Sequence, residues 1–153
     1  MNYLYIGKIV NTHGIKGEVR ILSNIQFKDK IFIKDMPIYI GKNKDKEIIN
    51  SYRVHKNFDM ITMIGYDNIN QILKYKGLNV YINREDLKLD ENEILDEDLI
   101  EFNVLINDKI VGKIKRIERY TKNNLIIVNN GVKDFLIPYV SDIILSVDTK
   151  KKE

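Results

Sequence analysis

Residues 7–21 read Gly-Lys-Ile-Val-Asn-Thr-His-Gly-Ile-Lys-Gly-Glu-Val-Arg-Ile, and this stretch decides how the rest of the chain is interpreted. Apolar and polar residues alternate on both sides of a short segment bounded by Gly14 and Gly17, which predicts two β-strands joined by a tight loop. The two glycines stand where such a connection needs positive φ, a conformation that glycine adopts without a Cβ penalty. We therefore expect a β-hairpin with a shaped loop.

The side chains around this loop are basic or can donate hydrogen bonds. Lys8, His13, Lys16 and Arg20 can reach phosphate groups or protein carbonyls, which makes the hairpin a candidate docking surface. An ordinary hairpin with solvated charges explains the same residues, because loops are polar for many reasons. The pattern alone leaves both interpretations open.

The composition indicates a globular chain without redox or membrane features. Of the 153 residues, 44% are hydrophobic and 31% are charged, which suits one ordinary domain or two small barrels. The absence of cysteine excludes disulfides, thiolate zinc sites and cysteine nucleophiles. No apolar run approaches the roughly 20 residues of a membrane-spanning helix, and no signal-peptide pattern opens the chain. We expect a cytoplasmic protein that contacts no membrane.

Charge is distributed unevenly along the chain. Residues 1–84 contain 14 Lys and Arg against 7 Asp and Glu, whereas residues 85–153 contain 11 against 15. Much of the acidity falls within residues 85–101, which predicts a domain boundary. The basic first part favours an anionic partner such as RNA, and the acidic stretch favours a basic protein or plain solvation. It lacks the ordered spacing of a calcium loop, so we expect no metal site.

Alternation of period two dominates and predicts an all-β fold of two small β-barrels. The expected strands comprise residues 3–10, 17–24, 36–41, 47–56, 59–66, 78–82, 103–106, 110–120, 125–129, 132–137 and 143–147, with turns at 107–108, 121–124 and 130–131. The expected domains are a barrel over residues 1–84, an acidic linker over 85–98, a barrel over 99–149, and a disordered tail over 150–153.

One helix is expected before the boundary. Asp67 can cap it and Gly77 can end it in the left-handed conformation. Ile69, Ile72 and Leu73 form an apolar stripe at helical spacing. We interpret this stripe as a plug over one end of the first barrel.

No set of residues for catalysis is recognisable. His13 and His55 are the only imidazoles, and neither has a His or Glu at metal-ligand spacing. Neither a nucleophile elbow nor a glycine-rich phosphate loop is present. His55 lies between Arg53 and Lys56 in a strand pattern, which favours an edge histidine over a general base. We expect a protein that is not an enzyme and binds no cofactor.

The hairpin stretch resembles the RimM family of ribosome maturation factors, whose members open with a strand, a His-Gly-hydrophobic-basic-Gly-acidic turn and a second strand. Further pieces follow in the family's order: Arg-Val-His-Lys-Asn at 53–57, Ile-Gly-Tyr-Asp-Asn at 64–68, Lys-Gly-Leu-Asn-Val-Tyr-Ile at 76–82, Asp-Leu-Ile at 98–100 and Leu-Ile-Pro-Tyr at 136–139. Their joint order makes the resemblance specific over nearly the whole chain. It implies a first barrel similar to those of translation factors and flavin reductases, followed by a PRC-type barrel.

The resemblance also implies a function. A protein of this family would be a non-enzymatic assembly chaperone that binds the immature head of the small ribosomal subunit as a monomer and promotes its maturation and 16S rRNA processing. Its partners would be ribosomal protein S19 and 16S rRNA. The ribosome-binding residues so implied are Lys8, His13, Gly14, Lys16, Gly17, Arg20, Ile94, Leu95 and Tyr139.

Two departures from the family pattern stand out. Ile94 and Leu95 occupy the positions of a Tyr-Tyr pair that contributes to ribosome binding, and Glu101 stands where a glycine is expected. Isoleucine and leucine can bury apolar area, but they lack the stacking face and hydroxyl of tyrosine. If Ile94 and Leu95 dock, we expect both to remain partly exposed.

Two other function classes stay open. A general RNA-binding or translation-factor-like module would bind mature subunits, free RNA and immature particles with comparable affinity. A flavin-binding barrel enzyme would rest on fold alone, which does not carry function. The aromatic platform of a single-strand binder is not evident, since Tyr39, Tyr52 and Phe58 are not regularly spaced.

Overall fold

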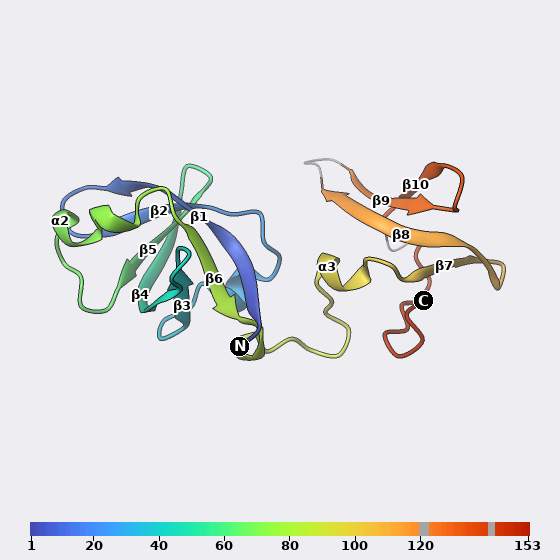
Figure 1. Ribbon diagram of the computed structural model, residues 1–153, viewed down its shortest axis with the longest axis horizontal. Helices are drawn as coiled ribbons and strands as arrows, with labels where there is room; N and C mark the ends of the chain where they lie inside the picture. Colours follow the sequence, from blue (N-terminus) through green and yellow to red (C-terminus); the bar gives the residue numbers. More distant parts are fainter. Residues whose placement is uncertain (120–122, 141–142) are drawn as a thin grey trace. The chain divides into compact units, whose positions relative to one another are not determined.

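The computed structural model describes residues 1–119, 123–140 and 143–153, and the chain divides into two compact units, Met1–Asp90 and Glu91–Glu153 (Figure 1). Each unit is built on its own antiparallel sheet, which confirms the predicted all-β class. The short helical segments are α1 (Lys28–Ile31), α2 (Ile69–Ile72), η1 (Leu73–Tyr75), η2 (Arg84–Asp86) and α3 (Asp96–Leu99).

The first unit is a closed barrel with the strand order β1-β2-β5-β4-β3-β6. Its strands are β1 (Tyr3–His13), β2 (Glu18–Leu22), β3 (Pro37–Ile40), β4 (Asp45–His55), β5 (Phe58–Met63) and β6 (Asn79–Asn83). Closure removes the unpaired strand edges that an open sheet leaves.

Alternation along each strand separates the inside of the barrel from the outside. Ile9, Ile21, Ile61 and Val80 point inward and are fully buried. Each such side chain contributes about 1.5–3 kcal/mol when it leaves water. The alternate residues face outward, so the side chains of one strand contribute both to the core and to the outer surface.

Asp59 is a buried carboxylate in this barrel, and its charge is paired. Lys28 Nζ lies 2.8 Å from Asp59 Oδ2, and the Tyr52 hydroxyl donates to Asp59 Oδ1 at 2.6 Å. Burial and this carboxylate raise the pKa of Tyr52. The interactions compensate for the removal of Asp59 from water.

The helix before the boundary begins one residue later than predicted. Asn68, rather than Asp67, caps α2, because its side chain accepts a hydrogen bond from the Asn70 amide at 2.8 Å. The chain then tightens into η1, and Gly77 adopts the predicted positive φ, at 84°. Leu73 of the expected stripe is 49% exposed, because the tighter η1 turn rotates it away from the barrel.

The second unit is an open four-stranded sheet with the order β10-β9-β8-β7. Its strands are β7 (Asn103–Ile106), β8 (Lys109–Arg119), β9 (Asn124–Asn129) and β10 (Asp134–Pro138). Its core contains Leu99, Phe102, Ile114, Ile126 and Val128.

The strand predicted at residues 143–147 was wrong, since the structure has no strand within these five described residues. The amides of Ile143 and Ile144 donate to the Val140 carbonyl at 3.1 and 3.0 Å, and this turn replaces extended backbone. Leu145 is 94% exposed, so the expected alternation buries nothing there.

The last residues make backbone hydrogen bonds. Asp148 and Glu153 exchange two backbone hydrogen bonds, at 2.8 and 3.0 Å, and the Lys152 carbonyl accepts from the Asn103 amide at 2.8 Å. The tail thereby forms a turn against β7. The final residue of the strand predicted at 110–120 lies outside the described residues, and so do the first two residues of the turn predicted at 121–124.

Candidate functional site

The outer surface of four neighbouring strands gathers side chains that are far apart in the sequence. On β1 and β2, His13 lies opposite Glu18. On β4 and β5, His55 lies opposite Phe58. We call this surface the His13 face and define it by His13, Glu18, Arg20, Arg53, His55 and Phe58.

Arg20 sits at the centre of the His13 face. One of its terminal nitrogens lies 2.8 Å from His13 Nδ1, and because a guanidinium can only donate, Nδ1 is the acceptor. Its Cζ lies 5.7 Å from the centre of the Phe58 ring. Its Nε is buried and finds no hydrogen-bond partner among the described residues. Two rings, rather than a carboxylate, therefore hold this cation.

Glu18 pairs instead with Arg53. The Arg53 Nε and terminal nitrogen donate to the two Glu18 oxygens at 2.9 and 2.7 Å, a two-bond geometry. The hydrogen bond from Arg53 lowers the pKa of Glu18. Since the carboxylate of the His13 face is directed at Arg53, it does not neutralise Arg20.

His55 lies beside His13, which its sequence position did not indicate. The two ring centres are 5.3 Å apart. Partial removal from water, and then the nearby charges of Arg53, His13, Lys56 and Arg20, lower the pKa of His55 below 6.5. Above that pKa the ring is neutral and offers hydrogen bonds without adding a charge.

The loop between β1 and β2 has the backbone that the sequence predicted. Gly14 and Gly17 adopt φ of 67° and 93°. The Ile15 carbonyl accepts from the Ile69 amide at 3.0 Å, which ties the loop to α2. Lys16 is exposed on this loop. The loop therefore presents Lys16 on a backbone fixed by its contact with α2.

Lys8 lies on the outer surface of the barrel, beside the His13 face. It is exposed on β1, opposite Leu22 on β2 and Asn79 on β6. It is thus next to the His13 face rather than inside it.

The tyrosine cluster that sequence reasoning missed lies on β1, β6 and β3. Tyr5 lies opposite Tyr81, and Tyr81 lies opposite Tyr39. Tyr3 packs edge-on against both Tyr39 and Tyr81. We call these four residues the tyrosine row. The spacing of Tyr3 and Tyr5 places them on one face of a strand, but only the strand register brings Tyr39 and Tyr81 to them.

In the second unit, the structure corrects one expected docking residue. Leu95 is 1% exposed, since the extended residue that precedes α3 turns its side chain inward. Ile94 keeps part of its surface exposed while it packs against the core of the unit. The expected exposure therefore holds for Ile94 and fails for Leu95.

Tyr139 is half-buried against the same core. Arg119 Cζ lies 5.4 Å from the centre of its ring, and Arg119 donates two hydrogen bonds to Asp96, at 2.5 and 2.7 Å. Burial and the charge of Asp96 raise the pKa of Tyr139. Tyr139 is thus fixed in place, with part of its ring still accessible.

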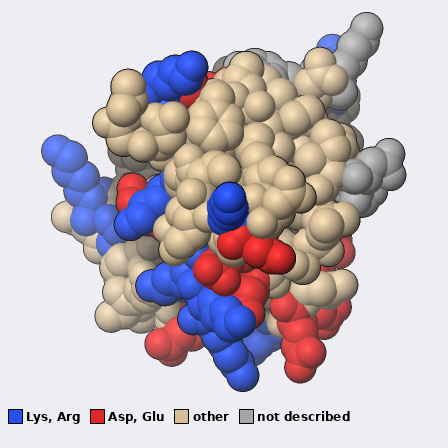
Figure 2. Space-filling model, turned by 90° about the vertical axis from the view of Figure 1, so that its right-hand side faces the viewer, with Lys and Arg blue, Asp and Glu red and all other residues tan. Residues whose placement is uncertain are grey.

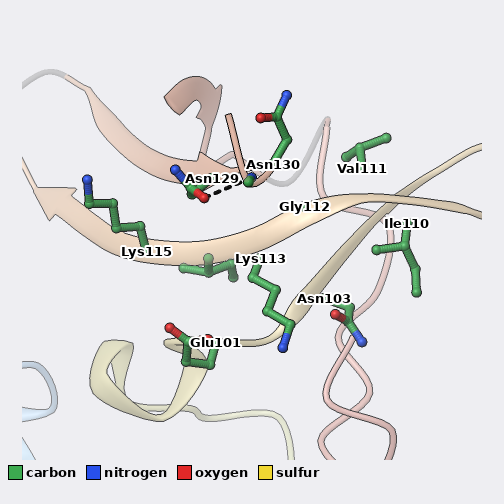
Figure 3. A pocket seen from close by; sticks show the side chains of 11 residues that line it. Glu101, Asn103, Ile110, Val111, Gly112, Lys113, Lys115, Asn129 and Asn130 are labelled. Carbon is green, nitrogen blue, oxygen red and sulfur yellow. Dashed lines mark hydrogen bonds between the residues drawn. The ribbon is translucent and has the colours of Figure 1, made fainter. Parts of the chain in front are cut away.

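A shallow concavity of about 610 Å³ lies along β8 (Figure 3). It is lined by Glu101, Asn103, residues 110–115 and residues 129–131. A Cβ on Gly112 would lie 2.6 Å from the Asn129 carbonyl oxygen, so glycine allows the two strands to approach there. The lining mixes both charge signs with amides and apolar side chains, and no predicted site residue belongs to it.

Charges of both signs also mix over the surface of the second unit. In Figure 2, basic and acidic side chains lie next to one another over the lower part of the view, and uncharged residues cover much of the rest. The residues placed by the structure contain no group of three His, Asp or Glu side chains arranged to hold a metal ion. Nor does any helix in the described ranges combine the length and apolar character of a membrane span.

Comparisons with known proteins match both units. The family model of the RimM N-terminal domain matches residues 4–87, and that of the RimM PRC barrel domain matches residues 96–153. Proteins called ribosome maturation factor RimM are 36% identical in Exiguobacterium, over 99% of this chain and 91% of theirs, and 39% identical in Staphylococcus haemolyticus, over 96% and 90%.

Two solved structures share the fold. A crystal structure from Pseudomonas aeruginosa, described as a 16S ribosomal RNA processing protein RimM, has a TM-score of 0.52 at 20% identity over 99% of this chain and 94% of its own. The solution structure of the N-terminal domain of RimM from Thermus thermophilus has a TM-score of 0.50 at 17% identity over 58% and 98%.

Proposed function

The chain belongs to the RimM family of ribosome maturation factors, and we propose that it binds the immature head of the small ribosomal subunit as a monomer in the cytoplasm and assists its assembly without catalysis. Membership supports a role in ribosome maturation and 16S rRNA processing. The proposed partners are 16S rRNA and the head protein S19.

The single observation that carries the RNA part of this proposal is the state of Arg20. Its guanidinium is held by His13 and Phe58, while the neighbouring Glu18 pairs with Arg53. A guanidinium that is positioned but not paired with a carboxylate is suited to a phosphate oxygen that approaches its accessible side. Lys16 on the adjacent loop adds a second positive charge.

The loop glycines give this surface a fixed shape. Gly14 and Gly17 hold the turn, and the bond between Ile15 and Ile69 fastens it to α2. A loop that is ordered before binding loses less conformational entropy on contact with a partner. Lys8, His13, Lys16 and Arg20 are therefore proposed as the RNA-contacting side chains of the barrel.

The second unit is proposed to contact protein. Ile94 and Tyr139 both keep part of their surface exposed, and the Arg119 guanidinium lies over the Tyr139 ring. Aromatic and arginine side chains are enriched at the energetic centres of protein interfaces. We leave Leu95 out of this contact because it is buried.

Co-sedimentation with purified immature and mature small subunits, at low and at near-physiological salt, tests the proposal. Preferential binding to the immature particle, weakening steeply with salt, is expected. Comparable binding to mature subunits and free RNA would instead support the general RNA-binding module, and absence of binding would contradict the assignment to subunit assembly.

A variant pair separates a specific surface from overall charge. Lys16→Glu with Arg20→Glu should weaken binding to immature subunits, whereas Lys150→Glu with Lys151→Glu changes the net charge equally at exposed residues of the other unit and should leave it nearly unchanged. Equal loss in both variants would show that only total charge matters.

A further inference from the structure

The tyrosine row forms an aromatic strip across three neighbouring strands. The Tyr5 and Tyr81 ring centres are 5.8 Å apart at an angle of 67°, and the Tyr3 and Tyr39 centres are 5.3 Å apart at the same angle. Edge-to-face contacts of this kind stabilise aromatic pairs. The rings therefore support one another and keep fixed orientations.

Part of this strip is open to solvent. Tyr5 is 49% exposed and Tyr3 is 39% exposed, whereas Tyr39 is 7% exposed and forms the floor beneath Tyr3. The outer rings thus present faces that a flat partner can cover, and they are already ordered before that partner arrives.

Two lysines lie beside the strip. Lys44 Nζ lies 4.4 Å from the centre of the Tyr81 ring and 5.3 Å from that of Tyr3. Lys46 is exposed on β4 opposite Tyr39. Asp45 lies between these two lysines in the sequence. It is paired with the inward-pointing Ile40, so its carboxylate does not lie on the face of the strip.

We propose that the tyrosine row is a stacking site for unpaired bases of single-stranded RNA. Bases stack on aromatic rings in proteins that bind single strands, while basic side chains follow the backbone. Lys44 would leave the ring faces as a base covers them and would then lie close to the flanking phosphate. The inference rests on the proposed function only in taking RNA as the partner.

The positive surroundings favour RNA over a basic protein segment. Lys44 and Lys46 would repel an arginine-rich or lysine-rich segment and attract phosphates. Lys8 extends the same field, because it lies between Leu22 on β2 and Asn79 on β6. An RNA strand that crosses Lys8 would pass from the tyrosine row to the edge of the His13 face.

Fluorescence anisotropy with a labelled, unstructured oligouridine of about eight nucleotides tests this proposal in the full chain. Tyr5→Leu keeps an apolar side chain at an exposed position but removes the ring, and it should weaken binding about 5- to 100-fold. Tyr5→Phe is the matched control, because it keeps the stacking face, and it should bind within about twofold of the unchanged protein.

A duplex RNA of the same length separates stacking from charge. Its bases are paired, so Tyr5→Leu should leave duplex binding unchanged, while Lys46→Gln should weaken both RNAs and lower the salt dependence. Single-strand binding that is unaffected by Tyr5→Leu, or lost equally in Tyr5→Phe, would overturn the stacking site. Co-sedimentation with immature subunits tests the proposed function separately. If the Tyr5→Leu variant still co-sediments with them and also binds oligouridine as the unchanged protein does, this inference is overturned and the proposed function stands.

Discussion

In the closed barrel, side chains such as Ile9, Ile21 and Ile61 are fully buried, whereas in the open sheet of the second unit Val128 alone reaches 0% exposure among the residues that the structure describes. A closed sheet encloses its whole inner face, whereas the four-stranded sheet of the second unit packs against a small core cluster. Both units keep apolar side chains in contact with solvent, such as Val54 in the barrel and Leu136 in the second unit, so the two units differ in how completely their cores are buried.

This difference predicts unequal tolerance to core truncation, which is the largest effect we expect. Ile61→Ala in the barrel should destabilise that unit by about 2–5 kcal/mol, since a rigid closed interior relaxes little around a cavity. Ile126→Ala in the second unit, where the residue is 5% exposed, should fall at or below the lower end of that range. Denaturant unfolding followed through amide NMR signals of each unit measures both.

The same experiment tests the independence of the two units. Each substitution should lower the stability of its own unit and leave the other transition in place. A single shared transition that shifts equally with either variant would break the comparison.

A second, smaller effect is expected in the hairpin loop. Gly17→Ala should destabilise the barrel by about 2 kcal/mol, because φ is positive and the new Cβ would lie 3.3 Å from the Asn68 amide nitrogen. Gly14→Ala shares the positive φ but meets nothing within 4 Å, so it should cost about 1 kcal/mol. Thermal unfolding of the two variants checks the order, and a reversed order would show that the contact with α2 does not shape the loop.

In the second unit, a substitution to glycine, rather than from glycine, tests the same left-handed backbone conformation. Glu101 adopts φ of 72°, in the left-handed region where family members are expected to carry glycine. Glu101→Gly should therefore stabilise this unit by up to about 1 kcal/mol, as relief of strain exceeds the added freedom of the unfolded chain. Denaturant unfolding of this unit measures the difference, and a less stable glycine variant would contradict the relief of backbone strain at residue 101.

The smallest predicted effect concerns acid. The Glu18 pKa is lowered in the folded barrel, so its pair with Arg53 stabilises the fold above the unfolded pKa, near 4.5, and loses this contribution as pH falls through the folded value. The stability difference between the unchanged protein and Glu18→Gln should be constant at neutral pH and shrink in acid. Glu91→Gln removes one carboxylate at an exposed position and is the control for the change in net charge.

Local pattern predicted most of the fold. Alternation located each strand of the barrel, and the Asn107-Asp108 turn appears with positive φ at both residues, as a tight hairpin requires. The segment at 143–147 shows the limit, because its apolar residues satisfy the strand pattern while only Ile144 packs against the core. Burial depends on neighbours that the pattern does not contain.

The candidate site was predicted only where its residues are close in sequence. His13, Lys16 and Arg20 belong to one hairpin and could be identified together. The approach of His55 to His13 depends on the pairing of β2 with β5 and of β5 with β4. Cross-strand neighbours follow from register, which a single sequence does not specify over such separations.

The central claim is that Arg20 of the His13 face and Lys16 of the adjacent loop bind RNA of the immature small subunit. The most direct test is the dependence of binding affinity on salt concentration, measured with immature subunits for the unchanged protein and for Lys16→Glu with Arg20→Glu. The account predicts lower affinity and a shallower slope of log affinity against log salt, reduced by roughly 2 for two lost phosphate contacts. An unaltered affinity and slope would contradict it.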